Sequence, residues 1–217
     1  MVAVADHQTA GRGRLDRTWE APPGSALLLS VLLRPSLLPT HVHSTTMVAA
    51  IAASDAFEEV AGFRPLLKWP NDVVVDDRKL GGLLAEAELE GDKVDAVVVG
   101  LGLNVNWDEA PPELAEIAVA ANQVAGRPVD REALLTHFLD RLEEHYSALV
   151  EPGGWRGTLL NYRRLSSTLG RDVRVELPGE TFTGRAVEVT GEGHLLVEVG
   201  GDVRRIPAGD VVHLRSV

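Results

Sequence analysis

The residues best suited to chemistry stand in a glycine-rich stretch near the start of the chain. In the run from His7 to Arg14, Arg12 and Arg14 alternate with glycines, and Trp19 follows shortly after. Glycine lets the backbone approach a ligand closely, while a guanidinium group presents a planar, permanent charge to phosphate or carboxylate oxygens. An indole can stack on a purine ring. The stretch therefore predicts a loop that binds a small anionic ligand.

Two familiar phosphate-binding motifs are excluded for this stretch. No Gly-Lys-Ser/Thr follows it, as a Walker loop requires, and the third glycine of a dinucleotide fingerprint is missing. A surface loop with solvated arginines is the alternative, and composition by itself favours that alternative.

A second candidate is the run from Lys68 to Asp72, in which an apolar strand ends and Pro-Asn-Asp forms a turn. A lysine at the end of a buried strand is costly unless its ammonium group meets an anion. The alternative is a lysine whose alkyl chain is buried while its ammonium group reaches solvent.

A third candidate is a pair of strands that carry glycines. The segment from Lys79 to Glu86 contains Gly81 and Gly82, and the segment from Gly100 to Val105 contains two further glycines and Asn104. Glycine inside a strand usually marks a bulge or the close approach of a ligand. Two such strands side by side predict a flat floor for a ring. Bulged strands packed beneath a helix are the alternative.

Periodicity and turn residues predict an α+β domain over residues 1–166 and a small all-β module over residues 167–217. The helix after residue 130 is expected to begin at Asp130, a favourable N-cap. The expected strands are 2–5, 26–33, 66–69, 80–89, 94–105, 173–177, 184–189, 195–199 and 211–214, and the expected helices are 40–60, 130–150 and 155–165.

Composition limits the class of protein. The 217 residues carry a net charge of −11 and are 45% hydrophobic, which is typical of soluble globular chains. No run is long enough to cross a membrane, and the first residues lack the pattern of a signal peptide. The acidic balance argues against non-specific binding to nucleic acid. Cysteine is absent, so disulfides and thiolate sites are excluded, and we expect a cytoplasmic protein.

Taken together and in this order, the segments resemble the catalytic domain of the biotin–protein ligases. The likeness rests on four motifs: Asp6 to Arg14 with Trp19, Lys68 to Asp72, Lys79 to Leu84, and Gly100 to Val105. Four ordered motifs are far more specific than any one of them. The resemblance implies a mixed sheet flanked by helices, as in class II synthetases, over residues 1–166, and an SH3-like β-barrel over residues 167–217.

The resemblance also implies the chemistry. The biotin carboxylate attacks the α-phosphorus of ATP to give biotinyl-5′-adenylate, and a lysine of a biotin carboxyl carrier protein, part of an acyl-CoA or pyruvate carboxylase, then takes the biotinyl group. Lys68 and Arg14 are expected to be catalytic. The implied biotin and adenylate site comprises Gln8, Gly11, Arg12, Gly13, Arg14, Trp19, Lys68, Gly81, Gly82 and Asn104. Mg²⁺ is expected with ATP, through ligands that the sequence does not identify.

One part of the family pattern is missing. Family members carry a Ser/Thr-Thr-Asn segment and a helix upstream of the Gly-Arg-Gly-Arg loop, and this sequence has none before Val2. For the chain as written, we expect weakened biotin binding and an exposed sheet edge. Two alternatives stay open: a lipoate or octanoate transferase, which shares this fold, and a non-catalytic remnant that binds nucleotide or carrier protein.

The expected partners follow from the same resemblance. The N-terminal DNA-binding domain of repressor-type members is absent from this sequence and the charge is acidic, so direct DNA binding is not expected. Membrane association is not expected either, since no run is long and apolar enough to span a membrane. A homodimer that pairs the edges of the two glycine-bearing strands is left open by analogy of fold.

Overall fold

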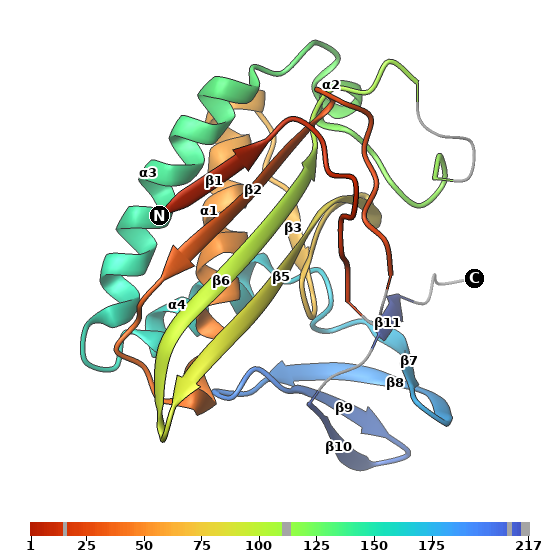
Figure 1. The fold of residues 1–217 in the computed structure, drawn as a ribbon. Helices are drawn as coiled ribbons and strands as arrows, with labels where there is room; N and C mark the ends of the chain where they lie inside the picture. The colour runs from red at the N-terminus through yellow and green to blue at the C-terminus, as the bar shows by residue number, and fades with distance from the viewer. Residues whose placement is uncertain (15–16, 110–113, 208–209, 214–217) are drawn as a thin grey trace.

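Residues 1–14, 17–109, 114–207 and 210–213 are described by a computed structural model of the chain. Six strands form a larger sheet in the order β1–β2–β6–β5–β4–β3, and five form a smaller sheet in the order β10–β9–β8–β7–β11 (Figure 1). The strands are β1 (Val2–Ala5), β2 (Ala26–Leu33), β3 (Leu66–Lys68), β4 (Asp72–Val75), β5 (Arg78–Glu90), β6 (Lys93–Asn104), β7 (Asp172–Leu177), β8 (Glu180–Val189), β9 (Leu195–Val199), β10 (Asp202–Ile206) and β11 (Asp210–His213).

Helices cover one face of the larger sheet, as Figure 1 shows. The helical elements are the 3-10 turn η1 (Pro39–His41) and the helices α1 (Ser44–Ala61), α2 (Ala121–Ala125), α3 (Arg131–Val150) and α4 (Trp155–Leu165), of which α1, α3 and α4 contact the sheet. The α+β class is therefore confirmed. The strand ladders are antiparallel, and within the described ranges parallel pairing occurs at two isolated bridges. None of the described helices is long and apolar enough to cross a membrane.

Small side chains let α1 pack closely in the core. Ala52, Ala53 and Ala56 are completely buried, and Phe57 fills the space beside them with no exposed surface. The helix ends at Gly62, whose φ of 79° is the left-handed conformation that favours glycine at this position. Asp130 caps α3 as the sequence predicts, because its carboxylate accepts hydrogen bonds from the backbone N–H groups of residues 132 and 133.

Alternation along the central strands separates a buried face from an open one. In β6, the four residues Val97, Val99, Leu101 and Leu103 belong to the apolar core beneath the helices. The residues between them face the other side, where Gly102 lies between Leu28 of β2 and Gly82 of β5. The open face is therefore poor in side chains, which is the flat floor that the glycines predict.

The glycine-bearing strands β5 and β6 lie inside the sheet, so the suggestion that they offer edges for dimerisation is wrong. They are flanked by β4 and β2, and the edge strands are β1 and β3. The sequence could not reveal this order, because strand pairing depends on contacts that are distant along the chain.

The turn at Pro70-Asn71-Asp72 is shorter than predicted, because Asp72 already begins β4. A second turn follows at Asp76 and Asp77, whose φ angles of 49° and 62° fit the two-residue hairpin that joins β4 to β5. Strand β4 was missed because two aspartate-containing turns leave only a few apolar residues between them.

The C-terminal module is all-β, as the sequence predicts. Strand β10 was missed, since its residues are mostly polar and exposed. Leu214, the last residue of the predicted final strand, lies outside the described residues. The strands form an antiparallel ladder that begins at β10 and ends at β11, and closure of this ladder into an SH3-like barrel stays a prediction.

Histidines lie where the smaller sheet meets the start of α1. Gly193, in the turn between β8 and β9, packs directly on His43, and a Cβ atom at this glycine would lie 2.5 Å from the imidazole Cδ2. Burial, reinforced by the neighbouring His41 and His194, lowers the pKa of His43 to about 4. The contact between the two parts therefore depends on a neutral imidazole.

We expect the stability of the protein to depend on His43 as the pH falls. The pKa of this group is lower in the folded protein than in the unfolded chain, so its contribution is complete above pH 6.5 and is lost as the pH falls toward 4. The loss is at most roughly 3 kcal/mol, because one pKa unit corresponds to ~1.4 kcal/mol. Urea unfolding at several pH values, compared between the wild type and His43→Gln, measures it.

The difference in unfolding free energy between these two proteins should decrease as the pH is lowered, since Gln does not titrate. His137→Gln on α3 is the matched control and should follow the wild type. A difference that stays constant from pH 7.5 to pH 4 would contradict the burial of a neutral His43.

Candidate active site

A pocket of about 380 Å³ lies on the open face of the larger sheet. Its volume is within the range of small-molecule sites. The walls come from three places: the loop between β1 and β2, the central strands of the sheet, and the corner formed by β4 and the start of β5. The main lining residues are Gln8, Arg12, Gly13, Arg14, Thr18, Trp19, Ser30, Asn71, Asp72, Lys79, Gly82, Leu84, Glu86, Gly100 and Gly102.

The floor requires glycine beneath Trp19. A Cβ atom at Gly102 would lie 2.6 Å from the indole Cε2 and 2.9 Å from both Cζ2 and Nε1, so any side chain there would displace the ring. At Gly100, two residues earlier, an added Cβ would meet its nearest atoms at 3.6 and 3.9 Å, which is ordinary contact. The indole Nε1 packs against Gly102, where it is buried and has no hydrogen-bond partner among the described residues.

The loop folds as a narrow hairpin over the pocket. The Gly13 N–H donates to the Arg17 carbonyl at 2.7 Å, and the Trp19 N–H donates to the Gly11 carbonyl at 3.0 Å. Gly11 cannot be replaced without rearrangement, because a Cβ atom there would overlap the Trp19 carbonyl. The glycines thus allow the two arms of the hairpin to approach closely. The hairpin in turn places Arg12 and Arg14 at the pocket.

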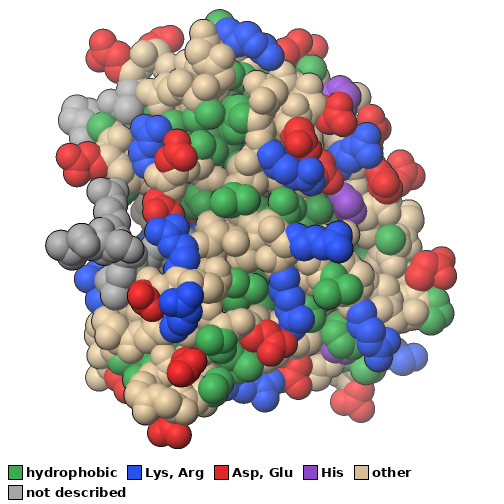
Figure 2. Space-filling view, turned by 180° about the vertical axis from the view of Figure 1, so that it is seen from behind, with side chains coloured by type: hydrophobic (Ala, Val, Ile, Leu, Met, Phe, Trp, Pro, Cys, Tyr) green, Lys and Arg blue, Asp and Glu red, His purple; other side chains and the backbone are tan. Residues whose placement is uncertain are grey.

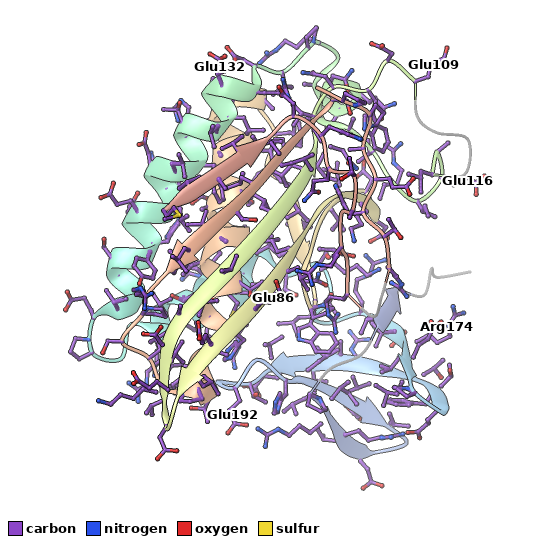
Figure 3. All side chains as sticks on the ribbon, in the orientation of Figure 1. Glu86, Glu109, Glu116, Glu132, Arg174 and Glu192 are labelled. Atoms are coloured by element: carbon purple, nitrogen blue, oxygen red, sulfur yellow. The ribbon has the colours of Figure 1, made fainter. Side chains whose placement is uncertain are left out.

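Each of three cations at the pocket contacts a polar group of the wall. The Arg12 Nη2 lies 3.0 Å from Glu86 Oε2, and Figure 3 shows Glu86 on β5 directed toward the loop. The Arg14 guanidinium donates to the Asn71 side-chain oxygen at 3.4 Å. The Lys79 Nζ lies 2.7 Å from Asp72 Oδ1 and 5.7 Å from the centre of the Trp19 ring.

The pocket is positively charged although the chain is acidic. Arginines 12, 14 and 17 and Lys79 line it, against the carboxylates of Asp72 and Glu86. On the face seen in Figure 2, by contrast, Lys and Arg side chains are interspersed with Asp and Glu. A local positive field on a protein with a net charge of −11 favours a small anion over a polyanionic polymer.

The structure brings most of the predicted site residues together. Gln8, Arg12, Gly13, Arg14, Trp19 and Gly82 all line the pocket. Four others are absent from its described lining: Gly11, Lys68, Gly81 and Asn104. Gly11 shapes the loop. Gly81 packs against Leu103, since a Cβ atom there would lie 2.5 Å from that side chain. Lys68 lies on β3 and is partly buried.

Asn104 supports the pocket from below. Its side chain is 4% exposed and donates to the carbonyls of Lys79, at 3.4 Å, and Val119, at 3.3 Å. The same two residues are linked by a backbone hydrogen bond of 2.9 Å from the Val119 N–H to the Lys79 carbonyl. Asn104 therefore holds the backbone that carries Lys79.

The residue that sequence reasoning passed over is Lys79. The resemblance gives a catalytic role to Lys68 and no role to Lys79, which begins one of the four motifs. A signal was available, because Lys79 directly precedes the glycines of a strand whose open face was expected to form the floor. The sequence likewise predicts only a turn at Asn71 and Asp72, although their side chains contact the pocket cations.

The described residues contain no group of three or more His, Cys, Asp or Glu side chains that could hold a metal ion. The two carboxylates of the pocket are already engaged by Arg12 and Lys79. Within the part of the chain that the structure describes, the pocket therefore offers no ready set of metal ligands.

The chain resembles known proteins in both sequence and fold. The biotin/lipoate A/B protein ligase family matches residues 1–104, and the biotin protein ligase C-terminal domain matches residues 168–214. A biotin protein ligase from Aquifex aeolicus, solved in complex with biotin and ATP, has a TM-score of 0.82 and 30% identity, covering 99% of this chain and 89% of that one.

Sequence relatives agree with the structural comparison. The bifunctional ligase/repressor BirA of Bacillus subtilis is 34% identical and matches 97% of this chain, which spans 65% of that protein. The biotin–[acetyl-CoA-carboxylase] ligase of Mycobacterium tuberculosis is 36% identical over 224 residues, which cover 99% of this chain and 79% of the relative. The chain therefore belongs to the biotin protein ligase family.

Proposed function

We propose that the protein activates biotin with ATP to form biotinyl-5′-adenylate and transfers the biotinyl group to a lysine of a carrier protein. The observation that carries the proposal is the positively charged pocket with a glycine floor, roofed by the Gly-Arg-Gly-Arg loop. The biotin and ATP bound to the Aquifex relative supply the identity of the ligands.

The first step joins two anions. A carboxylate oxygen of biotin attacks the α-phosphorus of ATP, the bond from that phosphorus to the bridging oxygen breaks, and pyrophosphate leaves. Both reactants are negatively charged, so bringing them together requires neutralisation. Arg12, Arg14 and Lys79 surround the pocket and are positioned before the ligand arrives, which favours the charge distribution of the transition state.

The second step needs an accessible adenylate. The carrier amine, once deprotonated, attacks the carbonyl carbon of the mixed anhydride, the bond to the phosphate oxygen breaks, and AMP leaves. No protein nucleophile is required, which agrees with a chain without cysteine. We propose that the loop with Arg12, Gly13 and Arg14 protects the adenylate from water until the carrier lysine enters, while Gln8 and Trp19 orient biotin and adenine.

Mg²⁺ belongs to the proposal as a companion of ATP. It usually keeps several waters and binds through substrate phosphates, which is compatible with a pocket whose two carboxylates are engaged by cations.

We also propose the domain boundary, the carrier protein and the cellular compartment. The boundary between residues 1–166 and 167–217 is supported by the C-terminal family match, which begins at residue 168. The carrier is proposed to be the biotin carboxyl carrier protein of an acyl-CoA or pyruvate carboxylase, and the compartment to be the cytoplasm.

The proposed function is tested by mixing the protein with ATP, Mg²⁺, biotin and a biotin-carrier domain. Carrier labelling detected with streptavidin, together with pyrophosphate release that needs both substrates, would support a biotin ligase. Labelling by lipoate in place of biotin would favour the lipoate or octanoate transferase. ATP or carrier binding without pyrophosphate release would favour the non-catalytic remnant.

We expect Lys79→Gln to lower the rate of pyrophosphate release by about 10²-fold, the usual cost of removing one group that stabilises transition-state charge. Lys68→Gln is the paired variant, since the family resemblance gives Lys68 the same role. Because Lys79 lines the pocket and Lys68 is absent from its described lining, the larger loss should occur at Lys79. A larger loss of the rate at Lys68 would instead support Lys68 as the catalytic lysine that the resemblance implies.

We expect Gly102→Ala to weaken ATP binding about tenfold, because the added Cβ would displace the Trp19 ring, which is proposed to pack against the adenine, from the floor. Isothermal titration with ATP measures the effect. Gly100→Ala is the matched control on the same strand and face, where a Cβ atom has room, and it should be the milder change. Equal losses in the two variants would mean that Trp19 does not need the bare floor.

A further inference from the structure

The turn between β8 and β9 docks onto the larger domain through backbone atoms. A Cβ atom at Gly191 would lie 2.9 Å from Cζ3 of Trp155, and one at Gly193 would lie 2.5 Å from His43. Glycine at both positions lets the turn lie flush against these rings. Figure 3 marks the turn at Glu192, beside the start of α1.

Ring nitrogens bind both glycine carbonyls. The His41 Nδ1 lies 3.0 Å from the Gly191 carbonyl oxygen, and the Trp69 indole N–H donates to the Gly193 carbonyl at 2.9 Å. His41 also stacks on Trp155, with ring centres 4.3 Å apart. Trp69 is only 3% exposed, so its N–H has no access to bulk water as a substitute partner.

A second part of the C-terminal region holds the backbone of the same tryptophan. The Trp69 N–H donates to Oγ1 of Thr168, a fully buried side chain, at 3.1 Å. Two residues before Trp69 and one residue before Thr168, the Ser167 N–H donates to the Leu67 carbonyl at 2.8 Å. The chain around Trp69 is thus held from two sides.

Trp69 directly precedes the wall of the pocket. Pro70 connects it to Asn71 and Asp72, which contact the two cations Arg14 and Lys79. Asn71 is itself bound to the floor strand, because its carbonyl accepts a 2.9 Å hydrogen bond from the Leu83 N–H. A shift of Trp69 would therefore move the groups that set the positions of these cations.

We propose that the β8–β9 turn positions the pocket wall through Trp69, so that the C-terminal sheet determines where Asn71 and Asp72 hold Arg14 and Lys79. Trp69 and Gly193 are positioning residues, because neither lines the described pocket. The inference rests on the proposed function for its kinetic consequence, but its structural part does not require turnover.

The test compares two tryptophans that contact the same turn. Trp69→Phe keeps an aromatic ring and removes the N–H donor to Gly193. Trp155→Phe alters the stack on His41 at the other end of the turn, away from the segment that leads to the pocket. Urea unfolding of both variants establishes how much each loosens the contact between the two parts.

The first readout is hydrogen exchange at the Leu83 amide, which reports directly on the position of Asn71 in the ligand-free protein. We expect this exchange to accelerate at least fivefold in Trp69→Phe and to stay within twofold of the wild type in Trp155→Phe. Equal protection of Leu83 in the two variants would overturn the proposal, whether or not the protein turns over.

The second readout is the rate of pyrophosphate release. Trp69→Phe should lower kcat about tenfold, and Gly193→Ala should not add to this loss when the two changes are combined, because a turn that is pushed away from His43 loses the same hydrogen bond from the Trp69 N–H. Should the wild type release no pyrophosphate, the proposed function fails, and the exchange at Leu83 still decides the positioning role. Additive losses in the double variant would contradict a shared contact.

Discussion

The site depends on the register of an antiparallel sheet that is covered on one side and open on the other. Burial of Val97, Val99 and Leu101 beneath the helices fixes which face of β6 points inward. The same register aligns Leu28, Gly102 and Gly82 across three strands on the open face. A slip of one residue would place leucines over the pocket and glycines in the core. Core packing and ligand access are therefore satisfied by one choice of register, and the apolar helix α1 is what enforces that choice.

Electrostatics adds a second constraint, since an acidic chain must assemble a cluster of cations. Each of these cations contacts a polar side chain of the pocket wall. Arg12 pairs with Glu86, Arg14 contacts Asn71, and Lys79 pairs with Asp72. These contacts are partly solvent-exposed and therefore contribute little to stability. Their value lies in orientation, because a cation that already points into the pocket loses little freedom when an anion arrives. An anionic ligand can take over the cations from their resting partners, and the walls then remain in place.

Sequence patterns were sufficient where local physics decides the structure. The limits of β2 and α4, the N-cap at Asp130 and the glycine floor all follow from periodicity, capping and the absence of side chains. They were insufficient where distant segments meet. Lys68 ends the short strand β3 and Lys79 stands near the start of the long strand β5, and only the pairing of β4 with β5 places Lys79 beside Asp72. Asn104 ends the glycine-rich strand β6 and resembles a ligand contact, yet its side-chain NH₂ group donates to two backbone carbonyls. Distinguishing a residue that lines a site from one that supports it requires the tertiary fold.

The run from Lys68 to Asp72 shows why a motif can be specific without all of its residues meeting the ligand. Asn71 and Asp72 face the pocket, whereas Trp69 is directed to the C-terminal sheet, where its indole binds Gly193 and its backbone binds Thr168. Adjacent residues are thus constrained in two ways. Asn71 and Asp72 are constrained by the pocket, and Trp69 is constrained by packing between the two sheets. Such a segment transmits displacement efficiently, because no flexible link separates its two contacts. A rigid connection of this kind makes the C-terminal sheet part of the pocket's framework, although within the described residues the lining itself comes from the larger domain.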